Sequence, residues 1–341
     1  MIPHGPRDGR RPASAPGGLL ASALPSADGS YDVRPMTPPP DPIDPPAFCD
    51  LHLHSAASDG TDAPADLPRL CRAAGLGAFA LTDHDTTAGL ADCAAAARKL
   101  KIHFLPGIEL SVNPDLHRTG QPAGTLHLLG YGIDPDDPGL AQLTAQLQQA
   151  RAQRNPRIIE KLNAQGVRLT YEEVTQLAQQ LAGNDRPAVV GRPHIAQLLL
   201  QKGYVKSIHE AFTRYLGVGG AAYTRRDGLA ADQAIAAIHA AGGIVSLAHP
   251  VQLRLDDPDL EHAVARLVDL GLDAIETRHS DHQPHDVRHF TRLADRFRLL
   301  TTGGSDYHGS RKPIALSDAR VPLDHYHQLH VALESKKANP V

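Results

Sequence analysis

From residue 48 onward, short apolar runs alternate with segments whose apolar residues recur every three or four positions. The runs FCDLHL, GAFALTD, IHFLPGIEL, TLHLLGYGI, IVSLAHP, LDAIET and LLTTGGSD have the length and composition of strands. Segments such as ADLPRLCRAAG and LEHAVARLVDLG have helical spacing and end at glycine, which commonly terminates helices. Alternating strands and helices are typical of parallel β/α units, so the pattern predicts an α/β fold.

Residues 138–225 break this alternation, because their apolar positions follow helical spacing throughout. We therefore expect a small helical domain over 138–225, inserted into a barrel-like domain made of residues 47–137 and 226–341. Residues 1–46 are rich in Pro, Gly, Ser and Ala and cannot bury enough apolar surface to fold, so they are predicted to be a disordered tail. The pattern leaves open whether translation starts at Met1 or at Met36.

Composition narrows the functional classes. The net charge of −4 argues against a general polyanion-binding surface. The three cysteines, Cys49, Cys71 and Cys93, are widely spaced, which indicates reduced thiols in a cytoplasmic protein and neither a disulfide framework nor a thiolate zinc site. No apolar run is long enough to span a membrane. The 20 histidines favour a metal site, since imidazole is the commonest metal-binding side chain.

Histidine and carboxylate residues fall at the ends of the predicted strands. His52 and His54 are two apart, so both point to the same face of their strand. A single residue of this kind is weak support for a metal site, because an incidental surface or core side chain explains it equally well. Together, buried imidazoles and carboxylates at converging strand ends are costly unless ions neutralise them. The candidate metal ligands are His52, His54, Asp59, His84, Glu109, His127, His249, Asp306 and His308.

The motifs around these residues resemble a known family. DLHLHSAASDG, LTDHDTTAGL, GIELS, HLLGYGI, AHP and GSDYHG occur in the order typical of the polymerase-and-histidinol-phosphatase (PHP) family, over roughly residues 48–310. The resemblance implies a distorted seven-stranded β/α barrel that holds two or three divalent ions at its strand C-termini. All nine candidate ligand positions carry residues able to bind metal, which predicts an active enzyme.

The resemblance also implies how the ions are held. We expect one ion at His52, His54, Glu109 and Asp306, a second at Glu109, His127 and His249, and a third at Asp59, His84 and His308. Imidazole and carboxylate ligands without thiolate suit Mn, Fe or Zn, and manganese is favoured by the resemblance. Ions about 3.5–4 Å apart activate a bridging water as hydroxide and clamp the attacked phosphate. The residues expected to act in catalysis are Glu109, His249, Asp306 and, assisting the leaving group, His282.

Three features resemble the branch of the family that hydrolyses nucleoside 3′,5′-bisphosphates and short RNA 5′ ends. They are Asp59, where several members have His, the helical insertion, and GYGID after His127. We therefore expect hydrolysis of the 3′-phosphate of a nucleoside 3′,5′-bisphosphate, such as adenosine 3′,5′-bisphosphate to AMP. The resemblance places the insertion over the metal face as a substrate cap.

A bisphosphate substrate needs cations beyond the metals, and arginine suits bidentate contact with phosphate. The alternative for a charge run is a solvated helix face. Arg151 and Arg154 share a helix face, and His194 is more simply explained as a satisfied surface or core histidine. The candidate substrate-binding residues are Arg154, Arg192, Arg225 and Ser280.

Three other functions stay open. One is 5′–3′ exoribonuclease action on short 5′-phosphorylated RNA, which uses the same chemistry. Another is histidinol phosphate hydrolysis, against which Asp59 and GYGID argue. The third is a non-catalytic, metal-stabilised module, which would have missing ligands and a much longer chain. No obligate protein partner is indicated, and the sequence leaves the oligomeric state undetermined.

Overall fold

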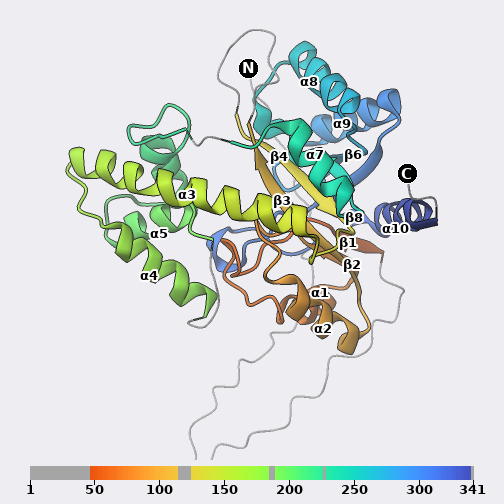
Figure 1. Ribbon diagram of the computed structural model, residues 1–341, viewed down its shortest axis with the longest axis horizontal. Coiled ribbons are helices and arrows are strands. Elements are labelled where there is room, and N and C mark those ends of the chain that lie inside the picture. Colours follow the sequence, from red (N-terminus) through yellow and green to blue (C-terminus); the bar gives the residue numbers. More distant parts are fainter. Residues whose placement is uncertain (1–46, 114–123, 184–188, 226–227, 339–341) are drawn as a thin grey trace, which may run out of the picture. The chain divides into compact units, whose positions relative to one another are not determined.

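The computed structural model describes residues 47–113, 124–183, 189–225 and 228–338 (Figure 1). The predicted tail, residues 1–46, and Arg226 lie outside these ranges. The strands are β1 (Phe48–Asp50), β2 (Leu76–Leu81), β3 (His103–Val112), β4 (Leu126–Tyr131), β5 (Ile244–Leu247), β6 (Ala274–His279), β7 (Leu300–Gly304) and β8 (Val321–Pro322). The helices outside the insertion are α1 (Leu67–Ala73), α2 (Leu90–Leu100), α7 (Ala231–Ala240), α8 (Asp257–Asp269), α9 (Pro284–Phe297) and α10 (Leu323–Ala338), with the short 3-10 turns η2 (Pro250–Leu253) and η3 (Gly309–Arg311).

The strands form one sheet in the order β7-β6-β5-β4-β3-β2-β1-β8. It nearly closes into a barrel, because the chain after β1 pairs with the end of β7: the amide of Leu51 donates to the carbonyl of Gly303 at 3.1 Å. Helices α1, α2, α7 and α9 pack on the outside of neighbouring strands (Figure 1). The α/β barrel predicted from sequence is therefore confirmed, with its seven expected strands and the two-residue β8 beside β1.

One strand departs from the expected parallel arrangement. β4 runs antiparallel to both β3 and β5, whereas β1–β2, β2–β3, β5–β6 and β6–β7 are parallel. A parallel pair requires a crossover of a dozen or more residues, usually a helix. No helix is described between β3 and β4, so the chain returns beside β3 in the opposite direction.

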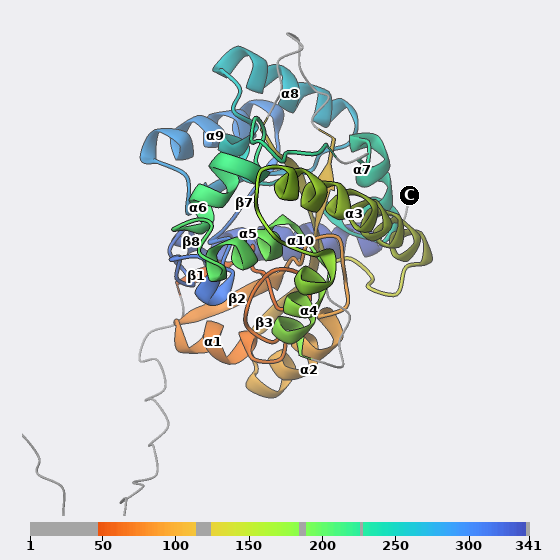
Figure 2. The same ribbon diagram turned by 90° about the vertical axis from the view of Figure 1, so that its left-hand side faces the viewer.

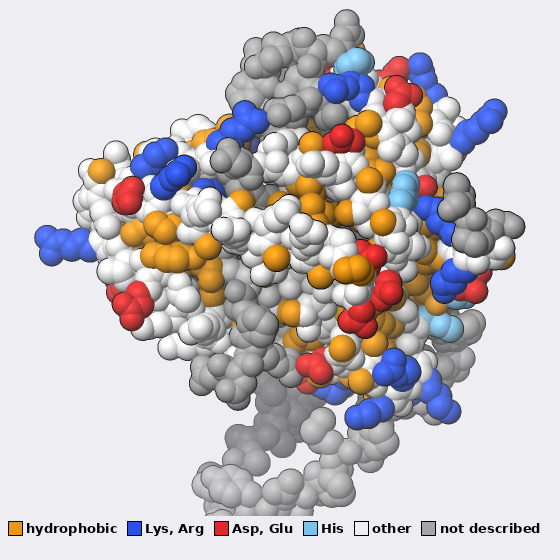
Figure 3. All heavy atoms as spheres, in the orientation of Figure 1, with side chains coloured by type: hydrophobic (Ala, Val, Ile, Leu, Met, Phe, Trp, Pro, Cys, Tyr) orange, Lys and Arg blue, Asp and Glu red, His pale blue; other side chains and the backbone are white. Residues whose placement is uncertain are grey.

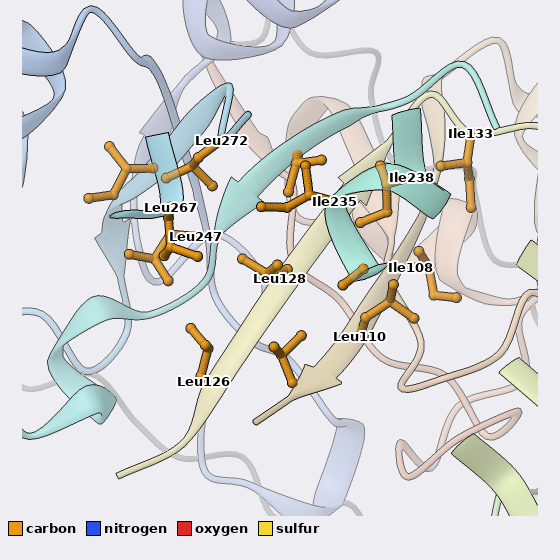
Figure 4. Close-up of a cluster of buried hydrophobic side chains, with 14 of the residues drawn as sticks. Ile108, Leu110, Leu126, Leu128, Ile133, Ile235, Ile238, Leu247, Leu267 and Leu272 are labelled. Atoms are coloured by element: carbon orange, nitrogen blue, oxygen red, sulfur yellow. The ribbon is translucent and has the colours of Figure 1, made fainter. Parts of the chain in front are cut away.

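Strand alternation separates an outer core from the face that carries the candidate ligands. Figure 4 shows Ile108 and Leu110 of β3 with Leu126 and Leu128 of β4, packed against Ile235 and Ile238 of α7 and other apolar side chains of this layer. All of these side chains are almost completely buried. Because successive residues of a strand point to opposite faces, Glu109 and His127 are directed inward, away from α7. The outer core thus fixes the direction of both candidate ligands.

The interior of the barrel is divided between an apolar end and a polar end. Residues near the N-terminal ends of the parallel strands, such as Cys49, Ala78 and Leu105, form a buried cluster with Tyr326 and Leu329 of α10. This cluster closes one end of the barrel with apolar side chains. The candidate ligands occupy the other end, where active sites of β/α barrels are built.

The helices between β4 and α7 have their own apolar cluster. They are α3 (Pro138–Ala164), α4 (Tyr171–Ala182), α5 (Arg192–Gln201), α6 (Ile208–Ala211) and the π-helix η1 (Phe212–Leu216). Ile158, Leu177, Ile195 and Leu199 are members of this cluster, which is separate from the barrel cores. The view in Figure 2 looks onto these helices. Among the described residues, no helix has the length and apolar composition needed to cross a membrane.

Candidate metal centre

The histidines that follow β1 point toward a carboxylate from β3. His52 and His54 are two positions apart, and both side chains are fully buried. Nε2 of His52 lies 3.3 Å from Oε2 of Glu109, and Nε2 of His54 lies 3.1 Å from the same oxygen. The spacing of two residues along extended backbone therefore brings both imidazoles to one point.

Glu109 is the centre of the cluster, because its carboxylate lies against five imidazole rings. Its oxygens are between 2.6 and 3.3 Å from ring nitrogens of His52, His54, His84, His127 and His249. Oε2 faces the rings that follow β1 and β2, whereas Oε1 faces those from β4 and from the end of β5. A carboxylate with separate imidazole groups on its two oxygens has the arrangement expected of a ligand that bridges two ions.

A second group surrounds Asp59, in the loop after β1. Oδ1 of Asp59 lies 3.3 Å from Nε2 of His308, and Oδ2 lies 3.9 Å from Nε2 of His84. Nδ1 of His54 is 3.7 Å from the same carboxylate. His54, Asp59, His84 and His308 thus form a four-residue group in which ligand atoms from all members lie within 4.8 Å of one another.

Asp306 completes the polar end of the barrel. Its Oδ1 lies 3.3 Å from Nε2 of His54 and 3.4 Å from Nδ1 of His308. Its Oδ2 accepts a hydrogen bond from Nζ of Lys312 at 2.6 Å. Asp306 and His249 both have positive φ, 57° and 28°, a conformation rare outside glycine.

The unsatisfied atoms of the cluster fit bound cations. Although carboxylates lie close by, several buried atoms have no hydrogen-bond partner among the described residues: His52 Nε2, both ring nitrogens of His54, His84 Nδ1, Glu109 Oε2 and His249 Nδ1. Buried polar atoms are normally hydrogen-bonded, so a set of orphans facing one point requires an explanation. Divalent ions would satisfy them, and a donor set of imidazoles and carboxylates without thiolate suits Mn, Fe or Zn. The residues present therefore fit metal binding.

The charges of the cluster shift its pKa values strongly. Burial raises the pKa of Glu109, but the imidazoles of His84, His127 and His52 outweigh it and hold that pKa well below the usual range. Burial lowers the pKa of His54, but contacts with Asp306 and Glu109 outweigh it and raise the pKa to about 9. Without metal, the imidazole of His54 therefore stays protonated at neutral pH.

Metal binding is accordingly expected to release protons. A metal requires the neutral imidazole, so an ion that uses His54 must displace its proton. Because the raised pKa is about 9, apparent affinity should rise about tenfold per pH unit below that value for each proton displaced. Calorimetric titration of Mn²⁺ at pH 7 in two buffers of different ionisation enthalpy measures the number released. Heats that do not depend on the buffer would contradict this expectation.

Glu276 and His279, both in β6, join the cluster but were missed in the sequence. Oε1 of Glu276 contacts Nδ1 of His52 at 3.1 Å, and Oε2 accepts the backbone amide of His249 at 2.6 Å. Nε2 of His279 lies 3.6 Å from Oδ2 of Asp306. Glu276 orients His52 so that its other nitrogen faces Glu109. Glu276 is the carboxylate near the end of the predicted strand LDAIET. The criterion used for the other ligands, a His or carboxylate at a strand end, would therefore have found it.

The loop that carries His84 is held by two flanking aspartates. Asp83 accepts hydrogen bonds from the amide of Ser55 at 2.8 Å and from the hydroxyl of Ser58 at 2.5 Å, which fixes the loop after β1. Asp85, at φ 52°, accepts the amide of Ser111 at 2.9 Å and pairs with the guanidinium of Arg151 in α3. Both carboxylates are buried. Arg151 thus connects α3 to the loop that carries His84.

The candidate ligands open onto a cavity of about 1100 Å³ between the barrel and the inserted helices. Its walls include Asp59, His84, His127 and His308 from the barrel. The arginines predicted to bind substrate also line it: Arg154, Arg192 and Arg225. The structure therefore brings metal-type ligands and arginines to one cavity.

Two of these arginines have protein partners, and two other predicted residues do not line the cavity. Arg154 donates to Oδ1 of Asn155 at 2.8 Å, and Arg192 donates to the carbonyl of Leu216 at 3.2 Å. Ser280 and His282 are not among the lining residues. His282 contacts the carbonyl of Thr277 at 3.1 Å through Nδ1, and burial lowers its pKa to about 4. Its role with the leaving group stays a prediction.

Sequence and structure comparisons identify relatives over most of the chain. It is 32% identical over 262 residues to the 3′,5′-nucleoside bisphosphate phosphatase of Chromobacterium violaceum, covering 77% of this chain and 87% of that protein. It is 31% identical over 261 residues to the 5′-3′ exoribonuclease Rnm of Escherichia coli, covering 76% and 84%. A solved structure from Bifidobacterium adolescentis, described as a metal-dependent phosphoesterase, has a TM-score of 0.73 at 29% identity and covers 84% of this chain and 97% of that chain.

The family assignment follows from these similarities and from the geometry of the cluster. A model of the PHP domain matches residues 50–242, more than half of the chain. The matched range begins at the last residue of β1 and contains β2, β3 and β4, with Glu109 and the imidazoles that surround it before β5. The relatives are named for the hydrolysis of phosphate esters, and the cluster has the donor atoms that such chemistry requires. The chain belongs to the PHP domain family and is a metal-dependent phosphoesterase.

Proposed function

We propose that this enzyme removes the 3′-phosphate of nucleoside 3′,5′-bisphosphates. One observation carries the proposal: a single cavity is lined by three imidazoles and one carboxylate of the ligand cluster and by several arginines. A substrate with one phosphate needs only the metal ligands, whereas a substrate with a second phosphate also needs cations beside them. The relative from Chromobacterium violaceum, named as a 3′,5′-nucleoside bisphosphate phosphatase, supports this choice.

The proposed metal assignment has one ion at His52, His54, Glu109 and Asp306, a second at Glu109, His127 and His249, and a third at Asp59, His84 and His308. It is supported by the distribution of imidazoles over the two oxygens of Glu109. Manganese is the proposed metal, with iron or zinc as alternatives. When bound, such ions neutralise the phosphoryl oxygens and lower the pKa of water.

The protein's own part in the proposed reaction is to fix these groups and to bind the substrate. Glu276 orients His52, and Asp83 fixes the loop that carries Asp59. We propose that residues 138–225 act as the cap, with Arg154 and Arg192 near the nucleotide. Water then adds to phosphorus and the bond to the 3′-oxygen breaks, which gives inorganic phosphate and a nucleoside 5′-monophosphate.

A second candidate is 5′–3′ exoribonuclease action on short RNA. The relative named as an exoribonuclease favours it, and a cavity of about 1100 Å³ has room for more than one nucleotide. Against long RNA, the described residues on the face in Figure 3 have basic and acidic side chains interspersed, without a continuous basic stripe. We therefore propose the mononucleotide as the preferred substrate and short RNA as an alternative one.

A substrate panel tests the proposal. Phosphate release is measured from adenosine 3′,5′-bisphosphate, AMP, histidinol phosphate and a 5′-phosphorylated short RNA, each with Mn²⁺ and with chelator. We expect manganese-dependent release from the bisphosphate, with kcat/KM at least about tenfold above that for AMP because only the bisphosphate has a 3′-ester beside a second anion. Preference for histidinol phosphate, or mononucleotide products from RNA at a higher kcat/KM, would contradict the proposed order.

A further inference from the structure

Arg311 is a buried cation for which the described part of the chain offers no hydrogen-bond partner. It ends η3, three residues after His308, and its side chain is only 9% exposed. Its three guanidinium nitrogens, Nε, Nη1 and Nη2, are buried and have no hydrogen-bond partner among the described residues. Arginine has five N–H donors and stays charged in proteins, so this leaves an unusual number of donors unsatisfied.

Two other cations near the metal face, unlike Arg311, are paired with carboxylates. Lys312 donates to Asp306 at 2.6 Å, and Arg151 pairs with Asp85. For Arg311, burial lowers the pKa and the carboxylate of Asp59 opposes this from a distance. A buried and unpaired guanidinium is costly, which is tolerated where an anion binds during function.

The position of Arg311 identifies the anion. It lines the same cavity as Asp59 and His308 on the metal face and as Arg192 on the inserted helices. Its planar fork matches the oxygens of a phosphate. The scissile phosphate would sit on the ions, so a cation outside the ligand set is left for a second phosphate.

We propose that Arg311 binds the phosphate that is not hydrolysed, and so sets the preference for bisphosphates over monophosphates. This inference rests on the proposed function. It makes Arg311 a binding residue that determines specificity, placed by η3 beside the ligands but outside their set. The sequence does not single it out, because GSRKP shows only an ordinary basic pair after the GSDYHG motif.

The test compares Arg311→Gln, Arg311→Lys and the full-length unmodified enzyme on two substrates. For Arg311→Gln we expect kcat/KM for adenosine 3′,5′-bisphosphate to fall about 30-fold, in line with loss of a charged hydrogen-bonding group. For adenosine 3′-monophosphate, kcat/KM should change less than about twofold, because the second phosphate is absent. Arg311→Lys keeps the charge without the fork and should be intermediate. Inhibition by AMP, which retains the 5′-phosphate, should weaken in parallel with the bisphosphate effect.

Two controls separate binding from a structural role. Arg288→Gln removes an exposed arginine of α9 that does not line the cavity and should leave kcat/KM for both substrates unchanged. Bound manganese, measured by elemental analysis, and the melting temperature of Arg311→Gln should equal those of the unmodified enzyme. If both substrates are impaired equally with loss of metal or of stability, Arg311 supports Asp59 instead, and the inference is wrong.

The inference and the proposed function fail in different ways. If the unmodified enzyme gives no manganese-dependent phosphate release from the bisphosphate, the proposed function fails and the inference fails with it. If it hydrolyses the bisphosphate without preferring it over adenosine 3′-monophosphate, only the inference is overturned. If the unmodified enzyme has that preference and Arg311→Gln retains it, only the inference is overturned. Loss of the preference in Arg311→Gln, with metal content intact, supports both.

Discussion

Replacing Glu109 by Gln is expected to reduce kcat/KM for phosphate release by about 10³-fold or more, and to reduce the manganese content. The substitution keeps the shape of the side chain but removes the charge that faces five imidazoles. An amide is a poor bridging ligand, so the ions on both sides of residue 109 are affected together. Kinetics with excess Mn²⁺ and elemental analysis of the purified protein measure the two effects.

The matched control for this prediction is Glu334→Gln, which makes the same chemical change at an exposed position of α10, where Glu334 pairs with Lys337. It should leave activity and metal content unchanged. The far-UV circular dichroism of Glu109→Gln should remain that of the folded protein, because the apolar cores lie elsewhere. Near-normal turnover by Glu109→Gln would make the proposed metal arrangement untenable.

Replacing Arg151 by Met is expected to lower the free energy of unfolding by about 3 kcal/mol. The side chain of Asp85 is fully buried, and that of Arg151 is 10% exposed. Removing only the guanidinium leaves a buried carboxylate without its cation, which is the costly way to break such a pair. Urea denaturation of the metal-free proteins measures the change. Arg157→Met, at an exposed position of the same helix, should change stability by less than about 0.5 kcal/mol.

A double-mutant cycle isolates the pair. Asp85→Asn keeps an acceptor for the amide of Ser111, and asparagine tolerates the positive φ of this position. Combined with Arg151→Met it removes both charges, so the double mutant should be more stable than the sum of the single changes predicts. A cost below about 1 kcal/mol for Arg151→Met would show that other contacts anchor α3 to the barrel.

The fold and the candidate ligands were predictable because both follow from local periodicity. Apolar runs place the strands, and the polar residues that end them must meet at one end of a barrel. His52, His84 and Glu109 illustrate this: they come from three successive predicted strands, and the two rings lie 3.3 and 3.0 Å from the carboxylate of Glu109. Motif order then supported the PHP family, which the comparisons confirmed.

Other features depend on tertiary geometry that periodicity does not encode. The antiparallel direction of β4 between β3 and β5 was not predicted, and neither was α10, which closes the apolar end of the barrel. Glu276 lies near the end of the run LDAIET, where the strand-end pattern could have indicated it, but its contacts with His52 and with the amide of His249 are visible only in the structure. The roles of the basic residues also depend on their partners: Arg151 bonds to Asp85, whereas Arg311 has no hydrogen-bond partner among the described residues.

The backbone around the ions adds a constraint on how this enzyme can change. Asp85, His249 and Asp306 have φ of 52°, 28° and 57°, and such conformations cost on the order of 1–3 kcal/mol each. Glycine at these positions would relieve the backbone strain but would remove a candidate ligand or, at Asp85, the partner of Arg151. Selection for a more heat-resistant variant therefore has little freedom at this end of the barrel. Such gains are expected in the outer helices and around α10, which leaves the reactive end as the least adaptable part of the fold.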